Sequence, residues 1–179
     1  MKTLLPLLVL LLAAGCTGID MTGYEKNKPE LDMFEYFKEP AKGWGIVQNR
    51  KGSLLRYFTV DIESELTEAG QLVLHESFVW NDGERSTRTW VLSRENKHTY
   101  SGTAGDVVGK AGGVAYGNVL NWRYVLNVKV DETTWKIAFD DWMFQVDDGI
   151  LINRARMSKF GFTVGEVTIF FSKQKNRER

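Results

Sequence analysis

The chain has 179 residues, the size of one domain, and its 43% hydrophobic and 26% charged residues are typical of a globular protein. Equal numbers of basic and acidic residues, 23 of each, exclude the broad positive field of a nucleic-acid-binding domain. One cysteine and two histidines exclude an intramolecular disulfide and make a metal site unexpected, so we expect no metal and no cofactor. Aromatic residues at 12% and only three prolines favour β structure.

Residues 1–15 have the pattern of a cleaved leader, with a positive Lys2 and an apolar run too short to span a bilayer. Small residues lead directly to Cys16, and the run MKTLLPLLVLLLAAGC resembles a bacterial lipoprotein lipobox. The resemblance implies that Cys16 becomes the mature N-terminus and carries acyl chains that anchor it to a membrane. Thr17, where an aspartate would retain the protein at the inner membrane, implies the periplasmic face of the outer membrane. An ordinary signal peptide with a chance cysteine is the alternative.

Residues 16–29 are polar, with glycines and a final proline, which predicts a lipidated tether. That proline opens the stretch PELDMFEYFK, in which Leu31, Phe34 and Phe37 recur at helical spacing. We expect one short helix here, lying across one end of a barrel domain that spans residues 30–172.

From Trp44 onward the period of the apolar residues changes to two, which predicts β-strands. The cleanest alternation runs from Leu120 to Val130. Glu76 falls on the apolar side of its strand, and Arg88 shares a face with apolar neighbours. Short strands at regular spacing, with no long helix between them, predict an antiparallel sandwich or barrel. Turns are predicted at 81–83, 117–118, 147–149 and 160–162.

Several stretches together resemble the DUF3833 lipoproteins over essentially the whole chain. They are the lipobox, LDMFEYF, Trp44-Gly45, Gly117-Asn118 followed by Trp122-Arg123-Tyr124, FDDWM, INRARMSKFG and VGEVTIFF. The resemblance implies an all-β, antiparallel, lipocalin-like barrel of about eight or more strands. It implies little about activity, because the family is named for its unknown function.

The charged residues of these blocks are the candidate polar site: Asp140, Asp141, Arg154, Lys159 and Glu166. They form either an ion-pair network that pins the closing strands or a cluster that orients a ligand in an apolar cavity. Neighbours on a regular strand point to opposite faces, so Asp141 points inward and Trp142 outward unless a β-bulge intervenes at the aspartate pair. Counting from the turn at 147–149 places Arg154 almost opposite the two aspartates, which predicts a structural ion pair and a strongly destabilising Arg154→Ala.

Six aromatic residues are candidates for lining an apolar pocket: Trp80, Trp90, Trp122, Tyr124, Trp135 and Trp142. Core filling is the alternative, since a barrel of about eight strands is either filled by side chains or holds one small ligand.

The sequence contains no GxSxG or HExxH motif, so we expect a protein that is not an enzyme. The first hypothesis is a lipid-anchored module that binds a small apolar or amphipathic ligand in the periplasm. The alternative is a structural or interaction lipoprotein with a filled barrel, and a weaker third hypothesis is an enzyme that uses Asp141 or Glu166. We expect a monomer, no nucleic-acid partner, and a solvated basic tail at 173–179.

Overall fold

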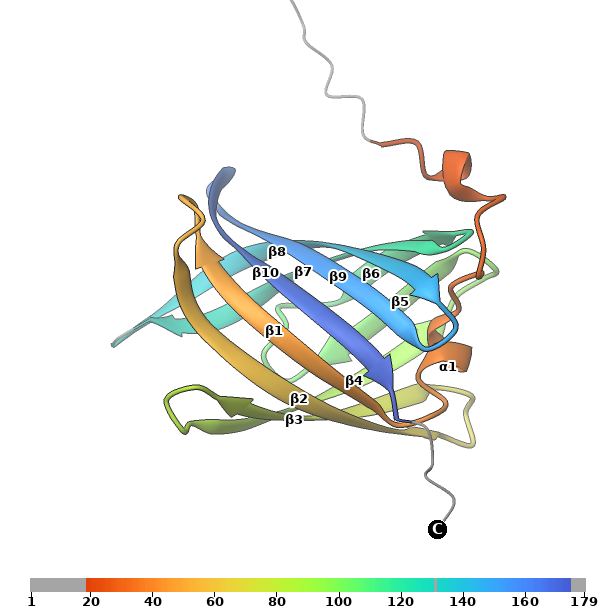
Figure 1. The fold of residues 1–179 in the computed structure, drawn as a ribbon, viewed down its shortest axis with the longest axis horizontal. Coiled ribbons are helices and arrows are strands. Elements are labelled where there is room, and N and C mark those ends of the chain that lie inside the picture. Colours follow the sequence, from red (N-terminus) through yellow and green to blue (C-terminus); the bar gives the residue numbers. More distant parts are fainter. Residues whose placement is uncertain (1–18, 131, 175–179) are drawn as a thin grey trace, which may run out of the picture.

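The structure, a computed structural model, describes residues 19–130 and 132–174, which form a closed barrel of ten antiparallel strands (Figure 1). Along the chain the strands are β1 (Ala41–Asn49), β2 (Leu54–Leu66), β3 (Leu72–Trp80), β4 (Arg85–Arg94), β5 (Thr99–Ala104), β6 (Ala111–Tyr116), β7 (Val119–Val130), β8 (Thr133–Asp147), β9 (Ile150–Lys159) and β10 (Phe162–Lys173). Each strand pairs with the next, and β1 pairs with β10 to close the wall. The predicted antiparallel, lipocalin-like barrel is confirmed.

The alternation of the sequence becomes the two faces of the barrel wall. On β2, for example, Phe58, Val60 and Ile62 are buried inside, while Tyr57 and Asp61, in the alternate phase, are exposed. Burying one such apolar side chain contributes about 1.5–3 kcal/mol, so the period-two pattern fixes which face of each strand turns inward.

A short helix closes one end of the barrel. Helix α1 (Met33–Tyr36) begins after Asp32, whose carboxylate accepts a hydrogen bond from the backbone N–H of Phe34 at 2.9 Å. Tyr36 is buried, and its hydroxyl donates to the carbonyl of Gly149 at 3.1 Å. The structure therefore contains the predicted short helix across a barrel end, which Figure 1 shows beside the C-terminal end of β10.

A 3₁₀ turn, η1 (Met21–Tyr24), lies at the same end. The backbone N–H of Leu31 bonds to the carbonyl of Gly117 in the β6–β7 turn at 2.8 Å, and a Cβ on Gly117 would collide with the carbonyl of Tyr24. Gly117 has a φ of +52°, so glycine suits this position on both counts. The chain before β1 therefore packs against the helix end of the barrel.

Strand β8 runs without a break through its aspartate pair. Asp140 lies opposite Arg123, and Asp141 opposite Trp122, in an unbroken register; the irregularity of this strand falls later, between Gln145 and Asp147. Because no bulge intervenes, Asp141 faces the interior and Trp142 the exterior.

Cys16 and the leader lie outside the described residues, as do residues 175–179 of the predicted tail. Within 19–130 and 132–174, none of the helices has the length and apolar character needed to cross a membrane.

Candidate functional site

The barrel encloses a cavity of about 490 Å³, within the range of sites that hold small molecules. At the helix end its lining residues Met33 and Phe37 are buried. At the opposite end the lining includes Arg56 and Glu84, whose side chains are 34% and 56% exposed. We call this second end the mouth. The interior is therefore open rather than filled, and access to it lies away from α1.

Aromatic rings form much of the cavity wall. The rings of Trp90 and Tyr124 lie 5.4 Å apart and nearly perpendicular, while Tyr124 and Phe139 stack at 5.1 Å. Four of the six predicted pocket aromatics line the cavity: Trp80, Trp90, Trp122 and Tyr124. Such a lining suits the apolar part of a ligand.

The other two predicted aromatics do not line it. Trp135 is 37% exposed and carries the ammonium group of Lys159 against its ring. Trp142 stacks with Phe144 on the outer face of β8.

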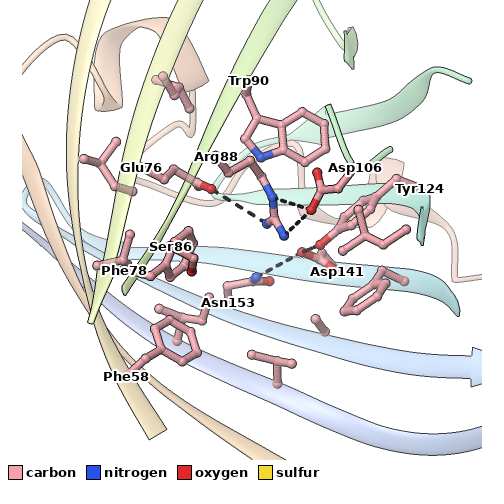
Figure 2. A pocket seen from close by; sticks show the side chains of 18 of the residues that line it. Phe58, Glu76, Phe78, Ser86, Arg88, Trp90, Asp106, Tyr124, Asp141 and Asn153 are labelled. Atoms are coloured by element: carbon pink, nitrogen blue, oxygen red, sulfur yellow. Dashed lines mark hydrogen bonds and ion pairs between the residues drawn. The ribbon is translucent and has the colours of Figure 1, made fainter. Parts of the chain in front are cut away.

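A polar cluster interrupts the apolar wall, and Figure 2 shows its members converging on the cavity from several strands. Arg88 of β4 donates from Nε and a terminal nitrogen to Oδ2 of Asp106 at 3.0 and 2.8 Å. Its other terminal nitrogen lies 3.7 Å from Oε2 of Glu76 on β3. Asp106 comes from the β5–β6 loop, which is tied to β7 by the hydrogen bond from Asn127 N–H to the Asp106 carbonyl.

Asp141 forms the second half of the cluster. One of its oxygens, Oδ2, accepts from the Tyr124 hydroxyl at 3.2 Å and from the Asn153 side-chain amide at 3.1 Å. The residue is only 3% exposed, and Oδ1 has no hydrogen-bond partner among the described residues. A buried carboxyl oxygen without a donor is costly, so this atom marks an unfilled position in the cluster.

Burial controls the protonation of these groups. It raises the pKa of Asp141 to about 7, against the lowering effect of the hydrogen bonds from Asn153 and Tyr124. It also raises the pKa of Glu76 to about 7, which the positive charge of Arg88 offsets only in part. Burial, with the charge of Asp141, raises the pKa of the Tyr124 hydroxyl well above its ordinary value. Two interior carboxyl groups therefore titrate near neutral pH.

Three of the remaining residues of the predicted polar site, Asp140, Arg154 and Glu166, lie on the outside of the wall, whereas Lys159 lies at the end of β9 with its ammonium over the Trp135 ring. Asp140 accepts from Arg123 and Arg156, each at 3.0 Å, and from the Asn121 amide at 2.8 Å. Burial alone would raise the pKa of Asp140, but these hydrogen bonds and the charge of Arg123 hold it below its ordinary value.

The predicted ion pair between Arg154 and the aspartates is wrong. Arg154 lies opposite Trp142, one residue out of register with Asp141, and one residue on a barrel wall means the opposite face. Its side chain is 68% exposed and pairs instead with Glu166 of β10 at 2.8 Å. Of the five predicted polar residues, the structure brings Asp141 alone to the cavity.

Four residues of the deep polar cluster were absent from the predicted set: Glu76, Arg88, Asp106 and Asn153. Glu76 and Arg88 did carry a signal, since both occupy the apolar phase of their strands. Asn153 carries the same signal on β9, between the buried Leu151 and Ala155. Asp106 carried none, because a loop has no phase that predicts an inward side chain.

The described side chains offer no group of three or more His, Cys, Asp or Glu residues arranged to hold a metal ion.

A family model described as "Protein of unknown function (DUF3833)" matches residues 10–173. Among solved structures, the S-type phycobiliprotein lyase CPES from Guillardia theta is similar with a TM-score of 0.60 at 8% identity, covering 82% of this chain and 95% of that one. A protein of unknown function from the DUF3598 family of Nostoc punctiforme PCC 73102 is similar with a TM-score of 0.52 at 12% identity, covering 83% and 51%. At such identities the likeness shows the fold alone. No curated protein matches the sequence.

Proposed function

Because the chain belongs to the DUF3833 family, whose function is unknown, we propose a function from the barrel itself: it binds a small amphipathic molecule inside the cavity. The observation that carries this proposal is the open interior of about 490 Å³, with an aromatic wall and one buried polar cluster. The wall suits an apolar body, while the cluster gives the polar end of the molecule a fixed place.

A lipid anchor at Cys16 and a place at the periplasmic face of the outer membrane are part of the proposal, supported by the lipobox-like run before the cysteine. The first described residues pack at the helix end of the barrel, so an anchor there leaves the mouth facing away from the membrane. Incorporation of labelled palmitate into the wild type, and its loss in Cys16→Ser, is the expected result. Equal labelling of both would contradict the anchor.

The test of binding uses an uncharged naphthalene fluorophore whose emission rises in apolar surroundings. Ala155→Phe places a ring inside the cavity, whereas Ala138→Phe adds the same ring to the exposed outer face of β8. We expect Ala155→Phe to weaken probe binding about tenfold, since filling a packed site costs about 1–3 kcal/mol and 1.4 kcal/mol is tenfold. Ala138→Phe should leave it unchanged.

Native mass spectrometry of protein extracted from its own cells gives an independent measurement that needs no variant. A bound molecule of stoichiometric amount is expected. Protein that is repeatedly empty, and a probe that does not bind, would together contradict the proposal.

Acid–base catalysis is a second candidate, and the specific observation in its favour is a carboxyl with a raised pKa among polar neighbours in an open pocket, Asp141. Glu166, the other carboxyl considered for this role, lies on the outer face beside Arg154. The bound molecule separates the two functions. A carrier yields the same compound from the wild type and from Asp141→Asn, while an enzyme yields a chemically altered one from the wild type alone.

A further inference from the structure

We propose that the cavity selects an amphipathic molecule whose buried end is cationic, an organic ammonium group on an apolar tail, and that Asp141 is its counter-ion. The proposal rests on the ligand-binding function proposed above and names the chemical class of that ligand.

The charge of the cavity wall favours a cation. Three carboxyl groups, from Glu76, Asp106 and Asp141, face one deep basic group, Arg88, which leaves a net charge of −2 when all four are ionised. The fork of Arg88 is already occupied by Asp106. An anionic head at this depth would compete with that carboxylate for its donors.

The other basic residues of the lining lie at the mouth and do not change this balance. Arg56 is held there by Asp82 and Glu84 at 2.7 and 2.8 Å, with its guanidinium 4.1 Å from the Trp80 ring centre. Lys129 is exposed near the end of β7.

The state of Asp141 points to the same class. It forms no ion pair with any described residue, and its two hydrogen bonds both reach Oδ2. Oδ1 is buried and lacks a donor, as do Oε2 of Glu76, Oδ1 of Asp106 and Oδ1 of Asn153. These four unpartnered atoms of the deep cluster are all acceptors, whereas the unpartnered Nε of Arg56 lies at the mouth. A group that donates hydrogen bonds fits them, and an ammonium group supplies three N–H donors together with the missing charge.

Aromatic rings lie near this position. Tyr124 donates its hydroxyl to Asp141, and its ring meets that of Trp90. A cation held between a carboxylate and aromatic rings gains from both, particularly away from water. The apolar tail then runs along the remaining wall toward the mouth.

Protonation adds a signature that a merely apolar pocket lacks. The groups that face Asp141 are Tyr124 from β7, the neutral Asn153 from β9, Glu76 and Arg88 from β3 and β4, and Asp106 from the loop; Asp140 points outward. Because Asp141 holds its proton up to about pH 7, a cationic ligand must displace that proton below this pH. Affinity for the cation should therefore rise as the pH rises through 7.

The experiment compares three probes with one tail: dodecylammonium, dodecanol and dodecanoate, below their aggregation concentrations, by displacement of the naphthalene fluorophore. Dodecylammonium should bind most tightly, with its Kd falling about tenfold from pH 6 to pH 8 through release of one proton. An alkylamine stays protonated over this range, since such amines titrate near pH 10. Dodecanol should show no pH dependence.

Asp141→Asn keeps the shape of the side chain and removes its charge, and Asp140→Asn makes the same change on the outer face. We expect Asp141→Asn to weaken dodecylammonium binding about tenfold or more and to flatten the pH dependence of its Kd. Adding Glu76→Gln should remove any pH dependence that remains. Asp140→Asn should leave both unchanged.

Equal affinity of the three probes for the wild type, or a preference for dodecanoate, would overturn the proposal while ligand binding stands. That comparison needs no variant, so it holds even if Asp141→Asn fails to fold. Binding of none of the probes would instead count against the proposed function itself.

Discussion

Two neighbouring aspartates of β8 stand on the two sides of one barrel wall and behave in opposite ways. Asp140, outside, is surrounded by Arg123, Arg156 and the Asn121 amide, which hold its pKa low. Asp141, inside, accepts hydrogen bonds from a hydroxyl and an amide but forms no ion pair with any described residue, and burial raises its pKa to about 7. One step along a strand therefore decides whether the same side chain completes a structural ion-pair cluster or remains an unfilled acceptor.

The comparison extends to the arginines of the two faces. Outside, Arg154 pairs with Glu166, and both are in contact with solvent that supports their charge. Inside, Arg88 holds Asp106 in a two-point contact while Glu76 lies at 3.7 Å, too far for a good hydrogen bond. An exposed ion pair of this kind contributes little to the free energy of unfolding, so its loss is tolerated. Breaking a buried cluster costs more, because the remaining charges stay buried without a partner.

The largest effect is expected from Arg88→Met. The change leaves Asp106 and Glu76 without their cation inside the barrel, which costs about 3–5 kcal/mol for a fully buried pair. Arg88 is 25% exposed to the cavity, so solvent screening reduces the expected loss to about 2–3 kcal/mol of unfolding free energy in urea melts. Arg156→Met on the outer face is the matched control and should cost about 0–1 kcal/mol. Equal losses from the two variants would show that the two faces do not differ.

Asp141→Asn should change how the free energy of unfolding depends on pH, and not only its magnitude. A raised carboxyl pKa contributes stability below the unfolded value near 4 that is lost as the pH rises through about 7. Each such group contributes up to about 1.4 kcal/mol per pH unit to that fall. Unfolding free energies of the ligand-free protein from pH 5 to pH 8 should fall less steeply in the variant. An unchanged slope would show that Asp141 titrates normally.

Asp140→Asn should change the pH dependence of stability in the opposite direction. A lowered carboxyl pKa contributes stability that is present above the unfolded value near 4 and lost as the pH falls through the folded value. We expect the variant to lose about 1 kcal/mol at pH 7 and to match the wild type at acidic pH, because surface ion pairs contribute about 0–1 kcal/mol. Melts at several pH values from 7 downward measure this difference, and a loss that does not shrink as the pH falls would contradict it.

Arg154→Ala should have the smallest effect, about 0–1 kcal/mol, because the arginine side chain is 68% exposed. This replaces the strong destabilisation expected from sequence. Thermal melts at low and high salt suit the measurement, since an exposed pair is screened by salt. A loss above about 2 kcal/mol would mean that the arginine is held more tightly than its exposure indicates.

The sequence predicted the strands well because their period is a local property, as in the run from Leu120 to Val130. The pattern left a sandwich or a barrel open, and the resemblance to the DUF3833 family implied the barrel. At the aspartate pair the sequence left two outcomes open, a β-bulge or an unbroken strand with Asp141 inside and Trp142 outside, and the structure shows the second. Glu76 and Arg88 were recognisable as charges in an apolar phase, but a strand pattern does not show which charges of different strands converge.

Two features required the three-dimensional structure. Asp106 reaches the cavity from a loop that bends over β7, which no periodicity encodes. Placing Arg154 required the residue-by-residue pairing of β8 with β9, since a register error of one residue moves a side chain to the opposite face of the wall.

The pairing of β1 with β10 joins Ala41 to Lys173 and Asn49 to Gly165, so the first and last strands form a seam. These contacts join residues that are far apart in the sequence. Long-range pairing of this kind slows folding, because the entropy of closing the long loop is lost before any contact stabilises it. Until β10 is available, β1 and β9 each present an unpaired edge, the usual starting point for aggregation. A chain emerging N-terminus first therefore cannot close its barrel until β10 has emerged, so the edge of β1 stays unpaired while strands β3 to β9 are synthesised.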